Sequence, residues 1–130
     1  MIKDIPNPEV EDVYLAVVQE AENDWKVYLI NRNKNNLETV MITSKGYGEK
    51  DGQEQKTSVL RHMLPMVEKG EFALIEPVDP SVFHLNNEYW VSFFINKQLY
   101  DKKYIFVPDT IKEENLVYIK ELDKKGVLHR

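Results

Sequence analysis

The chain of 130 residues contains no cysteine. This absence excludes disulfide bonds, catalytic thiols and thiolate metal sites. Small secreted domains often depend on disulfides, so a cysteine-free domain favours a reducing compartment. The opening sequence MIKDIPNP lacks the apolar run of a signal peptide, and no stretch approaches the roughly 18 apolar residues of a membrane helix. We therefore expect a cytoplasmic protein with no membrane segment.

An excess of basic charge is also missing. The 17 lysine and arginine residues are outnumbered by 22 aspartate and glutamate residues, and the net charge is −5. Proteins that bind nucleic acids need a basic face to neutralise phosphates. Here the basic residues are interspersed with acidic ones, and the basic pairs are Lys102-Lys103 and Lys124-Lys125. We therefore expect no nucleic-acid partner.

Seven short segments have the apolar alternation and the β-branched and aromatic side chains of strands. They are residues 12–20, 25–31, 37–44, 57–64, 71–78, 89–96 and 99–107. Turns rich in asparagine and glycine separate them, and we expect the first three to form a meander. The pattern predicts a single all-β domain over residues 1–130. Its expected architecture is an antiparallel β-sandwich with immunoglobulin-like topology, and the alternative is a small β-barrel.

Residues 57–67 fit two structures. Their apolar residues also have helical spacing, but Pro65 would break a helix or remove a hydrogen-bond donor from a sheet. We expect an edge-like strand that ends near Leu64. Further along the chain, the Asp79-Pro80-Ser81 sequence predicts a short helical turn.

The two ends of the domain lack the strand pattern. Residues 1–11 contain Pro6 and Pro8 and are expected to be an extended arm. Residues 109–130 are a mixed tail with a short helical segment, because Thr110 and Glu113 fit a capping box. A helix starting there could continue to Gly126. The alternative is one helical turn followed by an extended segment, and periodicity does not separate the two.

Residues 45–56 (KGYGEKDGQEQK) hold three of the five glycines and no aliphatic residue. We expect them to be the longest unstructured loop. Gly46 and Gly48 begin a partial match to a phosphate-binding glycine motif, but Asp51 stands where the third glycine belongs. No helix clearly follows, and Glu49 would repel a phosphate, so nucleotide binding is not expected.

No catalytic or metal-binding pattern is present. None of the four serines lies in a nucleophile elbow, and the histidines His62, His84 and His129 are scattered along the chain. A metal site would need the fold to bring His62 and His84 together, with Glu71 or Glu88. We therefore expect no metal, no cofactor and no catalytic residues, and a protein that is not an enzyme.

One patch is a candidate for binding a ligand or partner. Arg61 and His62 interrupt an apolar run, and on a strand they would point to opposite faces. A buried arginine there would need a carboxylate partner. These two residues adjoin the glycine-rich segment in sequence, and together they give the candidate patch: Lys45, Gly46, Tyr47, Gly48, Arg61 and His62.

Five segments carry a resemblance to a known family. They are 12–18 (DVYLAVV), 44–48 (SKGYG), 56–64 (KTSVLRHML), 85–94 (LNNEYWVSFF) and 103–111 (KYIFVPDTI). Over nearly its whole length the chain resembles a family of small uncharacterised proteins from Bacteroidota, which implies a bacterial cytosolic origin and no catalytic residues. Such proteins sometimes carry the label of a phenylalanyl-tRNA synthetase subunit. The residues do not support it, since a class II synthetase core needs a longer chain and ATP-clamping arginines.

The sequence therefore predicts a non-enzymatic binding or protein-interaction module. Its partner, or a second copy of the chain, would bind through a sheet edge or the 45–56 segment, because exposed strand edges readily pair. The alternative is a small-molecule-binding protein or enzyme with an aromatic pocket inside the fold. That pocket would be lined by Tyr14, Trp25, Tyr28, Trp90 and Phe94. A third option is an accessory component of a larger complex.

Overall fold

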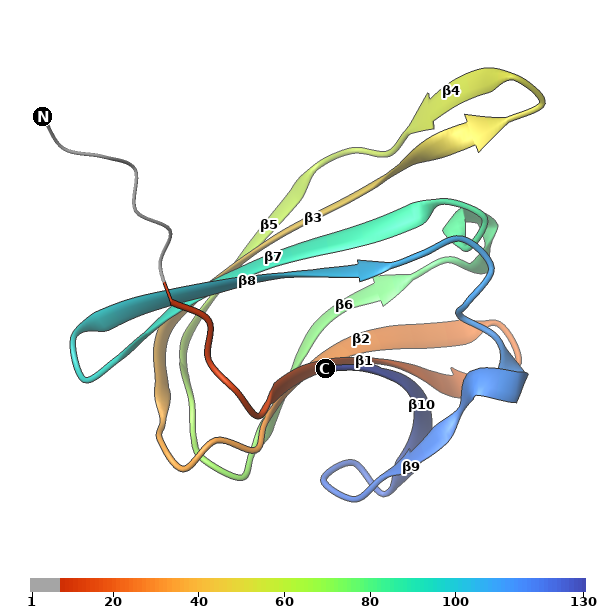
Figure 1. The fold of residues 1–130 in the computed structure, drawn as a ribbon. Helices are drawn as coiled ribbons and strands as arrows, with labels where there is room; N and C mark the ends of the chain where they lie inside the picture. The colour runs from red at the N-terminus through yellow and green to blue at the C-terminus, as the bar shows by residue number, and fades with distance from the viewer. Residues whose placement is uncertain (1–7) are drawn as a thin grey trace, which may run out of the picture.

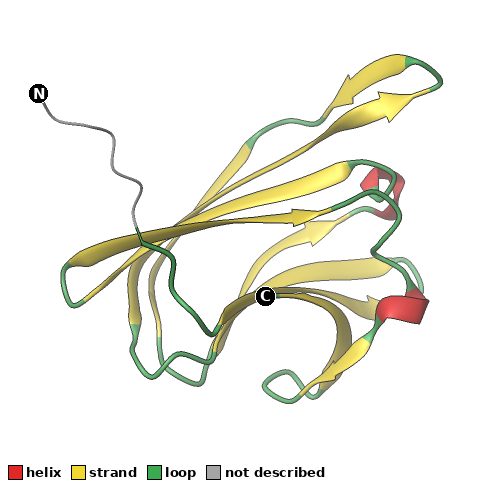
Figure 2. Cartoon of the chain, viewed as in Figure 1, coloured by secondary structure: helices red, strands yellow, loops and turns green. Residues whose placement is uncertain are grey.

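The computed structural model describes residues 8–130, whose regular structure is almost entirely β-strand (Figure 2). The strands are β1 (Val13–Ala21), β2 (Asp24–Asn31), β3 (Leu37–Lys50), β4 (Gln53–Lys56), β5 (Leu60–Val67), β6 (Phe72–Val78), β7 (Asn86–Ile95), β8 (Gln98–Phe106), β9 (Val117–Ile119) and β10 (Lys124–His129). They form two antiparallel sheets (Figure 1). Sheet A has the order β6-β2-β1-β10-β9. Sheet B has the order β4-β3-β7-β8, and β5 also pairs with β3.

The strand order is that of an immunoglobulin-like sandwich. β1, β2 and β6 occupy the places of strands A, B and E, and β3, β7 and β8 those of strands C, F and G. β5 extends sheet B beside β3, while β10 and β9 extend sheet A beside β1. The expected antiparallel sandwich is confirmed. The alternative of a small barrel is wrong, because both sheets keep open edges.

The expected meander of the first three strands is wrong, because β3 leaves sheet A and pairs in sheet B. The buried side chain of Asn31 explains this crossing. Its amide nitrogen donates to the carbonyl oxygens of Asn35 and Val67, at 2.9 and 3.1 Å. Its side-chain oxygen accepts the backbone N–H of Asn33 at 2.9 Å. These bonds fold the asparagine-rich turn back on itself and attach it to the end of β5.

The main core lies between the sheets, and its side chains come from the alternating inward positions of β1, β2, β3, β7 and β8. A second, smaller cluster lies on the outer face of sheet A, where Val18 and Ile30 contact Ile119. Figure 1 shows that sheet A curls at its β10–β9 end. β1 is nearly apolar throughout because both of its faces are buried.

The C-terminal segment follows the second of its two expected forms. One 3₁₀ turn, η2 (Glu113–Asn115), is followed by extended chain. The capping box does not form, because the Thr110 hydroxyl donates to the carbonyl oxygen of Val107 at 2.6 Å and η2 is preceded by Lys112. Of the expected N-terminal arm, residues 1–7 lie outside the described residues, and residues 8–12 precede β1 without strand structure.

The glycine-rich segment 45–56 is not a loop. β3 continues to Lys50 and forms a hairpin with β4, which projects beyond the rest of the sandwich (Figure 1). Only Asp51 and Gly52 form the turn, with φ of 53° and 77°. Positive φ at both central residues is the geometry of a two-residue hairpin turn, for which Asp-Gly is a preferred sequence. The expectation of an unstructured loop is wrong because the Asp-Gly signal outweighs the general polarity of the segment.

β5 is an edge-like strand, as expected, but it continues past Leu64 to Val67. Within residues 8–130 its strand partner is β3 alone. Pro65 can therefore lie in the strand, since an edge strand does not need every N–H for the sheet.

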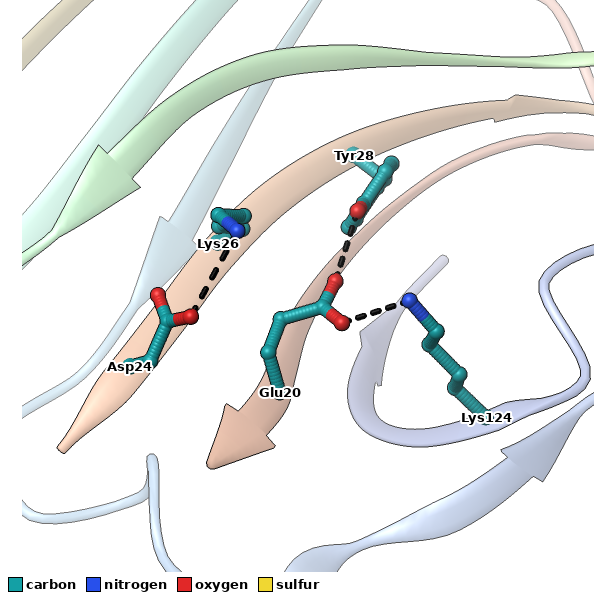
Figure 3. Close-up of polar contacts among 5 residues, drawn as sticks. All are labelled: Glu20, Asp24, Lys26, Tyr28 and Lys124. Carbon is teal, nitrogen blue, oxygen red and sulfur yellow. Dashed lines mark hydrogen bonds and ion pairs between the residues drawn. The ribbon is translucent and has the colours of Figure 1, made fainter. Parts of the chain in front are cut away.

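Glu20 links three strands at one end of sheet A (Figure 3). Its carboxylate accepts hydrogen bonds from the Tyr28 hydroxyl, at 2.7 Å, and from the ammonium of Lys124. The bond from Lys124 lowers the pKa of Glu20 most, and the bond from Tyr28 lowers it further. Burial and the bond to Glu20 raise the pKa of Tyr28 to about 12. β10 is thereby attached to β1 and β2 by charge as well as by backbone pairing.

Replacing Asn31 by alanine should destabilise the fold strongly. The change leaves two carbonyl groups and one N–H without their partner at a fully buried position. We expect the free energy of unfolding, measured by urea denaturation, to fall by roughly 2–3 kcal/mol. Asn36→Ala is the matched control, because the exposed Asn36 accepts a single bond from Lys69. Equal losses in the two variants would contradict the role of Asn31.

The stability should fall at acidic pH, in part through Glu20. The folded-state pKa of Glu20 lies below its ordinary value of 4.5. Its contribution is therefore complete above pH 4.5 and is lost as the pH falls through the folded-state pKa. Glu20→Gln should flatten the dependence of unfolding free energy on pH below about pH 5. Glu22→Gln, at an exposed position of the adjacent turn, should leave the pH dependence unchanged.

Candidate functional site

The edge of sheet B is interrupted beside Gly46, where β4 has ended and β5 has not begun. Thr57 bridges the interruption: its N–H donates to the Gly46 carbonyl at 2.9 Å, and its Oγ1 accepts the Gly46 N–H at 2.7 Å. The contact is so close that a Cβ at position 46 would lie 2.8 Å from Cγ2 of Thr57. Glycine is therefore required for this approach, which shapes two neighbouring hollows.

The first hollow, here named the inner cleft, has a volume of about 180 Å³ and lies toward the space between the sheets. Glu76 of β6 contributes a carboxylate whose side chain is only 9% exposed. One of its oxygens accepts from the Ser44 hydroxyl at 2.8 Å and contacts Nε2 of His62 at 2.7 Å. The other accepts from the Tyr89 hydroxyl at 3.2 Å. A carboxylate from sheet A is thus held by three side chains from sheet B.

A β-bulge places Glu76 in the interior. The register between β2 and β6 shifts so that Val27 pairs with Glu76 while the next residue, Tyr28, pairs with Leu74. The extra residue, Ile75, breaks the alternation, and both Ile75 and Glu76 are buried. The bulge therefore turns a charged side chain inward that regular pairing would expose.

The serine, histidine and carboxylate of the inner cleft are not in the order of a hydrolytic triad. In a triad the histidine lies between the serine and the carboxylate. Here the carboxylate of Glu76 lies between Ser44 and His62, and the serine hydroxyl donates to the acid. Burial, together with the charge of Glu76, raises the pKa of Tyr89, which stays a proton donor. The arrangement orients polar groups and provides no activated nucleophile.

The second hollow, here named the outer groove, has a volume of about 600 Å³ and runs along the β3–β4 hairpin. Glu88 of β7 organises its side chains. The Tyr47 hydroxyl donates to Glu88 at 3.1 Å, and Nζ of Lys45 lies 3.6 Å from the same carboxylate. Burial, with the bond to Glu88, raises the pKa of Tyr47. The groove therefore offers an aromatic face between fixed charges of both signs.

The structure brings most of the predicted patch together. Four of its residues line the outer groove: Lys45, Gly46, Tyr47 and Gly48. His62 instead contacts Glu76 in the interior, whereas Arg61 is exposed on the outer face and pairs in register with Thr43. The two residues thus lie on opposite faces, and the carboxylate expected beside a buried arginine is found beside the histidine.

Glu76, Ser44 and Tyr89 were not predicted as site residues. Glu76 had a signal in the sequence, because it is a charged residue inside the apolar strand FALIEPV and precedes Pro77. Ser44 and Tyr89 had none, since a serine or tyrosine in a strand is ordinary. Their approach to Glu76 is a consequence of packing between sheets.

The two histidines that a metal site would need are not brought together in the structure. His84 contacts the side-chain oxygen of Gln55 at 2.6 Å and does not meet His62. Among residues 8–130 no group of three or more histidine, aspartate or glutamate side chains could hold a metal ion.

The five aromatic residues expected to line one internal pocket lie on three different faces. Trp25 belongs to the main core, and Tyr14 and Tyr28 pack in the cluster outside sheet A. Trp90 and Phe94 alternate with buried residues of β7 and face outward from sheet B. They do not share a pocket, because strand alternation separates them.

Comparisons of this chain with known protein families, curated proteins and solved structures give no match. The resemblance to small Bacteroidota proteins therefore stays a prediction. Within the described part of the chain, no helix has the length and apolar character needed to cross a membrane.

Adding a methyl group at Gly46 should disturb the site through Thr57. Gly46→Ala places its Cβ 2.8 Å from Cγ2 of Thr57, so we expect a loss of roughly 1–3 kcal/mol in unfolding free energy. Thr57→Ser removes that methyl and keeps the hydroxyl that accepts the N–H of residue 46. The double variant should recover most of the loss in a thermal or urea melt. Additive effects of the two substitutions would show that the contact is not the cause.

Proposed function

We propose that this chain is a non-catalytic binding module of the bacterial cytoplasm, and that it binds its ligand in the outer groove and inner cleft around Gly46. The observation that carries the proposal is the interruption between β4 and β5, which leaves an open groove of about 600 Å³ beside Tyr47 and Glu88. Ligand sites of proteins have volumes of about 300–1,000 Å³.

Glu88 orients two side chains of the groove before any ligand binds. Glu88 holds both Tyr47 and Lys45, and all three lie on paired strands. Sites built on strands are more rigid than sites on loops, and ordered side chains lower the entropic cost of binding. In residues 8–130 every buried side-chain nitrogen and oxygen has a hydrogen-bond partner. The site therefore needs no rearrangement of the fold.

The open sheet edges are a weaker candidate for binding a partner than the groove is. Proline interrupts the edge strand β5 at Pro65 and the edge strand β6 at Pro77. Proline and β-bulges are devices by which natural sheets avoid edge-to-edge pairing. Self-association through an edge stays a prediction from the sequence, and the groove is the stronger candidate for recognition.

Binding can be mapped by ¹⁵N–¹H spectra of the protein with a fragment library of amines, carboxylates, amino acids, sugars and short peptides. We expect at least one class to shift the amide signals of Gly46, Tyr47 and Thr57. Tyr47→Ala should weaken that binding by about fivefold or more, because buried aromatic anchors dominate such sites.

Tyr118→Ala is the matched control, because Tyr118 is also a tyrosine whose hydroxyl donates to a carboxylate, that of Asp123. It lies on β9, outside the groove, and its loss should leave binding unchanged. Shifts confined to another surface, or no shifts with any class, would refute the proposed site.

A further inference from the structure

We infer that the inner cleft receives an alkylammonium group, with its charge against Glu76 and its methylene chain along the apolar walls. This inference rests on the proposed function and names the chemistry of one part of the ligand.

The charge of the cleft favours a cation. Its charged lining residues are Lys45, Glu76 and Asp79. Lys45 forms its ion pair with Glu88 in the outer groove, which leaves two carboxylates facing the cleft. The N–H of Ser81 donates to Asp79 at 2.8 Å and lowers the pKa of that carboxyl group. Asp79, which is exposed, therefore adds a second negative charge to the lining of the cleft.

Glu76 also retains capacity for one more donor. A carboxylate has about four acceptor positions, and the structure fills three of them, two on one oxygen and one on the other. Two of the three donors are the neutral hydroxyls of Ser44 and Tyr89, and the third is the ring of His62. A buried carboxylate is stabilised most by a hydrogen-bonded positive charge. His62 forms an ion pair with Glu76 only when its ring is protonated. An ammonium group would supply the missing donor together with a permanent positive charge.

The size and walls of the cleft suit a short alkyl chain. Its apolar lining includes Leu60, Pro77, Val78 and Val82. Methylene groups of an amine can lie along such walls while the charged end reaches a carboxylate, as the stem of a lysine does. The volume of about 180 Å³ equals that of about six water molecules, which is sufficient for a four- or five-atom chain.

The test is a titration with n-butylammonium at about pH 7.5, where a primary amine is charged. Neutral n-butanol is the shape-matched probe. We expect the amine to shift the amide signals of Ser44, Glu76 and Tyr89, and the alcohol to leave them unchanged. Glu76→Gln should weaken amine binding at least about tenfold. Glu121→Gln is the control, because Glu121 is also a buried carboxylate but pairs with Arg32 away from the cleft, and it should change amine binding little.

Two results of the titration would overturn the inference. Equal binding of amine and alcohol, or unchanged amine binding by a folded Glu76→Gln variant, would overturn it. Ser44→Ala provides a second test if Glu76→Gln is unfolded by circular dichroism, and it too should weaken the amine. A blocked Gly-Lys-Gly peptide, compared with its norleucine analogue, separates a lysine side chain from a free amine as the source of the group. If library fragments bind in the outer groove and no amine enters the cleft, the inference fails while the proposed function stands.

Discussion

A carboxylate held away from water between two sheets is the constraint on which this end of the molecule depends. Glu76 is stable there only because side chains from three strands of the opposite sheet are aimed at it. A buried charge without such partners is strongly destabilising. One side chain of β6 therefore links sheet A to β3, β5 and β7. The edge of sheet B opens beside Gly46 in the same region.

Several irregular features of the fold lie around that carboxylate. The bulge at Ile75 turns Glu76 inward, Pro77 follows it, and η1 (Pro80–Val82) begins after the cap provided by Asp79. On the facing sheet, the interruption between β4 and β5 lies opposite the same region. Bulges are over-represented next to binding and catalytic sites because they redirect a side chain. The regular part of the sandwich stabilises the fold, whereas the irregular region around Glu76 gives the inner cleft its shape and charge.

The sequence correctly predicted those strands whose apolar and polar residues alternate along the chain. Segments such as 25–31 and 89–96 lie on β2 and β7, because each alternates toward a core on at least one face. It did not predict the crossing after Asn31, since that depends on a bond to Val67, which is 36 residues away. The Asp51-Gly52 turn signal is present in the sequence, but the polarity and glycine content of the segment around it indicated a loop. The approach of Ser44 to Glu76 could not be predicted, because a bulge changes which face each residue occupies.

The position of β10 beside β1 has a consequence for biosynthesis. β1 is synthesised before the other strands of this domain. One of its two neighbours is β10, and the cover over its outer face comes from β9 and β10, which follow all the other strands in chain order. During translation the nascent sandwich exposes Val18 and Ile30 for as long as the intervening strands are being made. Early apolar surface of this kind is what chaperones bind. The β9–β10 hairpin can pair with β1 only after the strands between them have been synthesised.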